Sequence, residues 1–214
     1  MLESKSVLDL IQMGGVTMYV LLACGVLSLA VILQRGYVYW RHSLDCDQFL
    51  ADIKKALDKG AFEAAISICR IKNVPAALVV WAGLEKAGQP ERRIEEAMDR
   101  EILKEVLELE RYTSIVGIIG KVAVYIGLFG TVLGIIRAFH SISVLESGGL
   151  SVVIGGVSEA LICTATGLLI AVPSVVAHSL FMRRVDALAA DMQYCASTVL
   201  EYLTVPSGTP PDQP

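Results

Sequence analysis

Glu159 is the only carboxylate in the apolar stretch from Gly148 to Met182. An ionisable side chain in the middle of a membrane-length segment costs about 2.5–3.5 kcal/mol on insertion scales, and such groups usually face a protein interior or a water-filled path. Glu159 is therefore the first candidate for a functional residue, because inside the membrane it could be solvated, paired or protonated. The alternative is a carboxylate that only stabilises helix packing, and the sequence leaves both open.

A few other polar side chains lie in the apolar stretches before and around Glu159: Lys121, Thr131, Ser158, Thr164 and Thr166. A hydroxyl in a membrane helix often bonds a carbonyl of its own preceding turn, which implies no further function. Hydroxyls at the depth of a carboxylate could instead line a narrow wet path for protons. Thr131 and Thr164 lie at suitable depths, so with Glu159 they could line such a path. Lys121, Ser158 and Thr166 are further candidates for pore or interface positions.

Helix geometry limits how these residues can act together. At about 100° per residue, Thr164 points about 140° away from Glu159, whereas Thr166 lies within about 20° of it. A common path for Glu159 and Thr164 therefore needs a wide pore, a distorted helix or a neighbouring subunit. Lys121 could snorkel toward the membrane interface or pair with an acidic residue of a partner helix.

Small residues recur at helical spacing in the same stretches, and small faces let helix backbones approach closely. We predict helix packing for six of them: Gly127, Gly130, Gly134, Gly156, Ala160 and Gly167. Ordinary helix packing explains most of these glycines. Two helices with small faces would also suit a ring of subunits, but the ring cannot be derived from this pattern.

The composition indicates a membrane protein. The 214-residue chain is 54% hydrophobic, with a mean hydropathy of +0.60, and the apolar residues gather in three blocks. A net charge of −4 without a basic tract makes nucleic acid an unexpected partner. The five cysteines are dispersed and form no C-x-x-C pair, which argues against a disulfide framework or a metal site. No catalytic or nucleotide-binding motif is found, so we expect no enzyme, no metal and no cofactor.

The blocks and their flanks predict an all-α membrane protein with three transmembrane helices and long cytoplasmic helical extensions. The first block is charge-free, spans the roughly 30 Å hydrocarbon core and is predicted to be a retained helix, not a cleaved signal peptide. The second is predicted to continue a cytoplasmic helix that starts at about Pro90. The predicted parts are a periplasmic N-terminus (1–12), helix one (13–34), a cytoplasmic helical domain (35–111), helix two (112–139), a periplasmic loop (140–149), helix three (150–182), a cytoplasmic helix (183–204) and a disordered tail (205–214).

The distribution of basic residues predicts the orientation. Arg35, Arg41, Arg111, Arg183 and Arg184 lie on one side of the blocks, and Lys5 and Arg137 lie on the other. By the positive-inside rule, the helical domain and the C-terminus are cytoplasmic, and the N-terminus and the loop between helices two and three are outside.

Two motifs in this order resemble the MotA/TolQ/ExbB proton channel family. They are GLFGTVLGIIRAF (Gly127 to Phe139) and GGVSEALICTATGLLIAVPSVVAHSLF (Gly155 to Phe181), and the middle domain from Lys59 to Cys69 is similar too. The chain looks closer to the ExbB/TolQ branch than to the longer flagellar subunit. It departs from the family ahead of the first motif, where Lys121 and Val124 occupy a stretch that often holds a small residue and a proline.

The resemblance implies a homopentamer in the inner membrane of a Gram-negative bacterium, around two copies of a single-helix ExbD/TolR/MotB-like partner. The partner would carry the proton-accepting Asp, and Thr131, Glu159 and Thr164 would lie at or near the pore. We thus expect a motor subunit that converts proton-motive force into mechanical work, with H⁺ favoured over Na⁺. Import across the outer membrane, envelope maintenance, gliding motility and polymer secretion remain open as its load. A passive membrane scaffold that only clamps a partner is the alternative, and a small-solute transporter is disfavoured because no inverted repeat is found.

Overall fold

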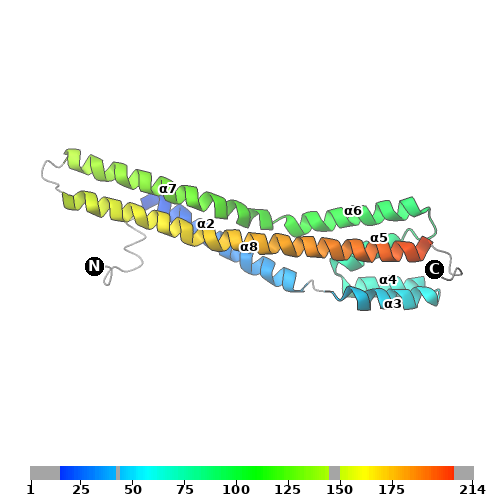
Figure 1. Cartoon of the computed structure of the whole chain (residues 1–214). Helices are drawn as coiled ribbons and strands as arrows, with labels where there is room; N and C mark the ends of the chain where they lie inside the picture. The colour runs from blue at the N-terminus through cyan, green and yellow to red at the C-terminus, as the bar shows by residue number, and fades with distance from the viewer. Residues whose placement is uncertain (1–14, 42–43, 145–149, 205–214) are drawn as a thin grey trace, which may run out of the picture. The chain divides into compact units, whose positions relative to one another are not determined.

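The computed structural model describes residues 15–41, 44–144 and 150–204, and these residues form helices and connecting turns without any strand (Figure 1). The helices are α2 (Gly15–Arg41), α3 (Cys46–Asp58), α4 (Phe62–Lys72), α5 (Pro75–Leu84), α6 (Glu91–Glu110), α7 (Thr113–Val144) and α8 (Leu150–Thr204). Three helical stretches are long and apolar enough to cross a membrane: Gly15–Tyr39, Glu91–Ser141 and Ile154–Thr204. The predicted all-α membrane class with three apolar helices is confirmed.

The observed helix bounds refine the predicted parts. The helix of the first block continues to Arg41, and α7 continues to Val144, into the stretch predicted as a loop. The third block and the helix predicted after it form the single α8, which passes through Pro173. The predicted N-terminal segment 1–12 and tail 205–214 lie outside the described residues, as does part of the predicted loop.

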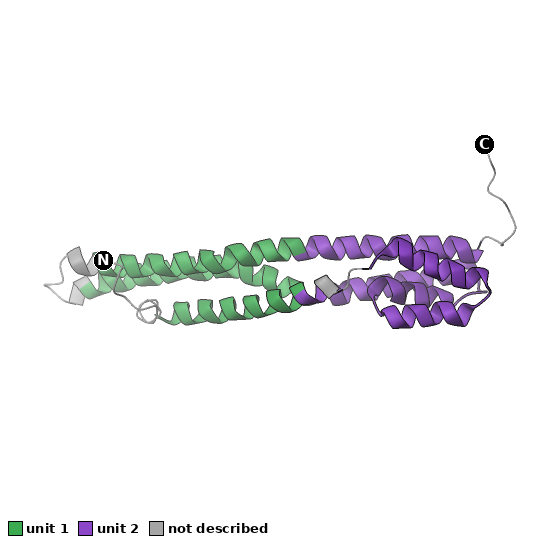
Figure 2. Cartoon of the chain, turned by 90° about the horizontal axis from the view of Figure 1, so that it is seen from below, with its two compact units in different colours: residues 1–36, 112–180 green, residues 37–111, 181–214 purple. Residues whose placement is uncertain are grey.

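The chain divides into two compact units (Figure 2). Unit 1 comprises Met1–Gly36 and Tyr112–Leu180, and unit 2 comprises Tyr37–Arg111 and Phe181–Pro214. Because α8 extends from Leu150 to Thr204, it contributes to both units. Unit 1 holds most of the apolar blocks, and unit 2 holds the short helices α3, α4 and α5 together with α6.

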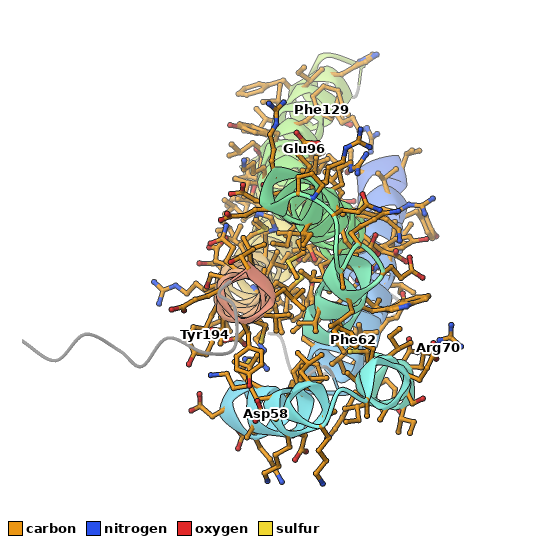
Figure 3. The ribbon with its side chains drawn as sticks, turned by 90° about the vertical axis from the view of Figure 1, so that its right-hand side faces the viewer. Asp58, Phe62, Arg70, Glu96, Phe129 and Tyr194 are labelled. Atoms are coloured by element: carbon orange, nitrogen blue, oxygen red, sulfur yellow. The ribbon has the colours of Figure 1, made fainter. Side chains whose placement is uncertain are left out.

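Unit 2 is organised around an apolar core to which α3, α5, α6 and the last turns of α8 contribute. Its largest buried side chains are Phe49, Ile53, Ile94, Met98 and Met192. Asp45 caps α3, because its Oδ1 accepts a hydrogen bond from the Gln48 backbone N–H at 3.2 Å. From α8, Tyr194 extends toward α3, where its hydroxyl donates to Asp47 Oδ1 at 3.3 Å (Figure 3).

The predicted single helix from Pro90 to Phe139 is wrong in one respect: it is divided at Arg111–Tyr112. Backbone carbonyls on the two sides of the division accept hydrogen bonds from side chains of other helices. In unit 2 the Tyr39 hydroxyl donates to the carbonyl of Leu109 at 2.8 Å. In unit 1 His178 Nδ1 lies 3.1 Å from the carbonyl of Thr113, to which it must donate. Neither contact could be foreseen from a run of residues with uninterrupted helical periodicity.

In unit 1, α7 and α8 run antiparallel and approach closely because small residues face each other. A Cβ added at Gly134 would lie 2.6 Å from the Cβ of Ala160, and one at Gly156 would lie 2.6 Å from the Cβ of Ala138. A Cβ at Gly127 would lie 3.2 Å from the Cα of Thr164. Small residues predicted for helix packing therefore pack α7 against α8 within this chain.

A buried hydroxyl pair joins α2 to α8. Ser28 Oγ lies 2.7 Å from Ser174 Oγ, and Ser174 donates its own proton to the carbonyl of Ile170 at 2.7 Å. The Ser28 hydroxyl is therefore the donor between the two helices. Both side chains are buried, so the bond has no competition from water.

We expect Ser28→Ala to lower the free energy of unfolding by about 0.6–1 kcal/mol, because hydrogen bonds between membrane helices contribute about that much. Denaturation of the purified chain in mixed detergent micelles would measure it. Ser179→Ala, at an exposed position of α8, is the matched control and should change little. Equal effects of the two substitutions would show that the buried pair does not stabilise the fold.

Candidate functional site

Glu159 lies half-buried in the wall of a cavity of about 200 Å³ inside unit 1. The cavity is bounded by α2, α7 and α8. Its polar and sulfur-containing lining residues are Thr17, Arg137, Ser141, Glu159 and Cys163, and the remainder of the wall is small or apolar. The lone carboxylate predicted from the sequence thus borders space that can hold water, instead of being enclosed by apolar side chains.

Thr164 does not line this cavity. Its hydroxyl donates to the carbonyl of Gly127 at 3.1 Å, which ties α8 to α7 at a close approach of the two backbones. The residue before it, Cys163, does line the cavity, and its Sγ lies 3.7 Å from Thr17 Oγ1 of α2. In agreement with the angular offset calculated from helix geometry, Glu159 and Thr164 have different surroundings: Glu159 lines the cavity, and Thr164 faces the backbone of α7.

The other predicted polar residues lie apart from the cavity. The Thr131 hydroxyl donates to the carbonyl of Leu128 at 2.6 Å, and that of Thr166 donates to Ile162 at 2.9 Å, so both bond their own helices. Ser158 is exposed. Lys121 is also exposed on α7, and no carboxylate among the described residues forms an ion pair with it. A pore role for these residues stays a prediction.

Sequence reasoning missed Thr17, Arg137, Ser141 and Cys163 as neighbours of Glu159. From the sequence, Arg137 served only to predict the orientation of the helices in the membrane. A signal was present on α7, where Gly130, Gly134, Arg137 and Ser141 recur at spacings of three and four and so share one face. No comparable signal exists for Thr17, because its place beside Cys163 depends on the packing of α2 against α8.

Among the described residues, no cluster of three or more His, Cys, Asp or Glu side chains is arranged to hold a metal ion, and no two cysteines form a disulfide. Burial raises the pKa of the Cys69 thiol to about 12 and also raises that of Cys46. Both thiols are therefore protonated at neutral pH and weak nucleophiles.

We expect Cys69 to resist alkylation by iodoacetamide at pH 8 in the folded chain. With a pKa of about 12, roughly one thiol in ten thousand is ionised at that pH, and the rate should rise about tenfold per pH unit until the fold is lost. Mass spectrometry of peptides after timed alkylation would measure this. Full labelling should follow unfolding in denaturant at the same pH, and rapid labelling without denaturant would contradict the predicted burial.

Comparison with known proteins agrees with the motifs. The family model described as the MotA/TolQ/ExbB proton channel family matches residues 71–194, more than half of the chain. The Tol-Pal system protein TolQ of Haemophilus influenzae is 40% identical over 95 residues, which are 44% of this chain and 42% of that protein. The biopolymer transport protein ExbB of Pseudomonas putida is 34% identical over 150 residues, which are 70% of this chain and 46% of that protein.

A match of greater coverage is the putative biopolymer transport protein ExbB-like 3 of Synechocystis, 28% identical over 177 residues, or 80% of this chain and 84% of that protein. The chain spans less than half the length of the TolQ and ExbB proteins named above. These relatives confirm the predicted resemblance to the ExbB/TolQ branch. The chain belongs to the MotA/TolQ/ExbB proton channel family.

Proposed function

We propose that this chain is a subunit of a proton channel that converts proton-motive force into mechanical work. The observation that carries the proposal is Glu159, the only carboxylate of its apolar stretch, in the wall of a polar cavity within the membrane segment. A carboxylate in such a place can hydrate and tune a proton path. The membrane potential supplies about 2.3 kcal/mol per charge per 100 mV, which is sufficient to drive work.

Family membership supports a proposed assembly. Five copies of the chain form a ring in the inner membrane of a Gram-negative bacterium, and the ring encloses two copies of a single-helix partner of the ExbD/TolR/MotB kind. The partner provides the Asp that accepts the proton. The C-terminus and unit 2 lie in the cytoplasm, and the N-terminus and the α7–α8 connection lie in the periplasm, in accord with the basic residues near the helix ends.

One set of contacts favours the alternative of a passive scaffold that clamps a partner helix. The hydroxyls of Thr131, Thr164 and Thr166 all donate to backbone carbonyls, which is what a purely structural role requires. The scaffold and the channel differ in one measurable property. Only the channel moves protons across a sealed membrane.

The test is proton flux in liposomes that contain the chain with its partner. A potential is imposed with valinomycin and a potassium gradient, and a trapped pH-sensitive dye reports acidification. We expect flux well above that of liposomes with the chain alone. An intact complex that binds its partner but carries no flux would refute the channel and support the scaffold.

A further inference from the structure

The cavity beside Glu159 holds two opposite charges from two helices. Glu159 belongs to α8 and Arg137 to α7, and both contribute to its wall. Within the described ranges, no ion pair joins them at 4.0 Å or less. Two charged groups that share a cavity without touching need another source of solvation, and water is the simplest one.

The cavity has the size and the lining to hold water. Its volume of about 200 Å³ exceeds what one water requires, and ordered waters need two to four polar partners. The guanidinium of Arg137, the carboxylate of Glu159 and the hydroxyls of Thr17 and Ser141 provide them. An apolar cavity of similar volume would stay dry, so the polar lining is what allows this cavity to hold water.

The register of α7 against α8 gives the relative depth of the residues that line the cavity. Gly134 lies opposite Ala160, and Ala138 lies opposite Gly156, so the level of Glu159 on α8 corresponds to residue 135 of α7. Arg137 is therefore about 3 Å closer than Glu159 to the connected ends of the two helices, at about 1.5 Å per residue. Ser141 lies farther out still. Cys163 lies one turn deeper than Glu159, beside Thr17 and Gly130.

The start of α2 lies against the Arg137 side chain, which lines the cavity. A Cβ at Gly15 would lie 2.9 Å from Arg137 Nη1, so the guanidinium packs against the backbone of Gly15. Gly15 also has a φ of +58°, which a residue with a side chain rarely adopts. The positive φ is what favours glycine at this position, because a small shift of the flexible guanidinium would relieve the contact with an added Cβ. Arg137 is exposed, whereas Glu159 is half-buried.

We propose that this cavity is a water-filled vestibule within each subunit, open toward the α7–α8 connection, in which Arg137 selects by charge what reaches Glu159. Arg137 lies near the mouth and Glu159 deeper inside. A cation that moves with its hydration shell must pass the guanidinium and is disfavoured, whereas a proton can be relayed along hydrogen-bonded waters. The role of Arg137 in selecting ions rests on the proposed channel function. The existence of the vestibule and the effect of Arg137 on charged solutes that enter it do not rest on that function.

The native Cys163 thiol allows a test that needs no ion current. Methanethiosulfonates of similar size but different charge serve as probes: methyl (neutral), aminoethyl (cationic) and sulfonatoethyl (anionic). The thiolate attacks the sulfenyl sulfur, a mixed disulfide forms and methanesulfinate leaves. Each probe is added to vesicles on the side of the α7–α8 connection, and peptide mass spectrometry gives the rate at Cys163 alone. The rate of each charged probe is divided by the rate of the neutral probe, which removes differences in thiol reactivity between variants.

In the native chain we expect the anionic probe to react with Cys163 about tenfold faster than the cationic probe. Arg137→Gln should remove most of this ratio, Arg137→Lys should retain it, and Glu159→Gln should increase it. Arg183→Gln removes an exposed cation from the part of α8 in unit 2 and should leave the ratio unchanged. A cysteine at the outer position, Ser141→Cys, should react faster than Cys163 with both charged probes.

Two results would overturn the proposal. If the charged probes modify Ser141→Cys but never Cys163, the cavity is not connected to water. If Cys163 reacts at rates that do not depend on Arg137, the guanidinium is not a filter. Failure of the proposed function is a separate result: complexes with a reactive, charge-selective Cys163 but without proton flux would retain the vestibule and lose the channel.

Discussion

Glu159→Gln is expected to lower proton flux through the complex by about 10- to 100-fold. The substitution keeps the size of the side chain and removes its negative charge. At an effective dielectric constant of about 20, two unit charges 4 Å apart interact by about 4 kcal/mol, and loss of only a third to two thirds of this energy gives the stated range. Dye-based flux in liposomes with the partner would measure it.

The matched control is Glu201→Gln, which removes the same charge from an exposed position of the same helix in unit 2. It should leave flux within about twofold of the native value. Partner binding, measured by co-purification, should survive both substitutions, since neither changes side-chain size. Full flux in the Glu159→Gln complex would show that this carboxylate only stabilises packing, the alternative that the sequence left open.

Gly167→Ala is expected to lower the free energy of unfolding by about 2 kcal/mol, because overpacking in a close contact costs about 1–3 kcal/mol. The added Cβ would lie 2.7 Å from the carbonyl oxygen of Ala123 and 3.1 Å from the Cα of Gly127. Both are backbone atoms, so relief requires α7 and α8 to move apart. That movement would also stretch the bond from Thr164 to the Gly127 carbonyl. Denaturant titration in mixed micelles would measure the change.

Gly155→Ala provides the control on the same helix. Its added Cβ would meet no atom within 4 Å, so the substitution should be neutral or stabilise the helix by up to about 1 kcal/mol. The two variants change the same atoms and differ only in the space available. If Gly167→Ala proved as stable as Gly155→Ala, the close backbone contact of α7 and α8 would be refuted.

The interruption between α6 and α7 could not be predicted from the sequence. Hydrophobic periodicity from Ile94 onward continues without a proline or glycine into the second apolar block, so it predicts one helix. The division at Arg111–Tyr112 accompanies bonds from Tyr39 and His178, which come from other parts of the chain. Periodicity records which face of a segment is apolar. It contains no information about which distant side chain reaches a carbonyl.

The sequence by itself determined that this is a helical membrane protein of a proton channel family and that Glu159 is its unusual residue. Those conclusions depend on local properties: apolar length, spacing of small residues, and the cost of a charge in the membrane. Only the tertiary structure decided the neighbours of Glu159. Arg137, Thr17 and Cys163 line the same cavity as Glu159 because α2, α7 and α8 pack in one register, with Gly134 against Ala160 and Gly156 against Ala138. Register depends on contacts between segments far apart in the chain, and these are set by the fit of whole helix surfaces, not by any one segment.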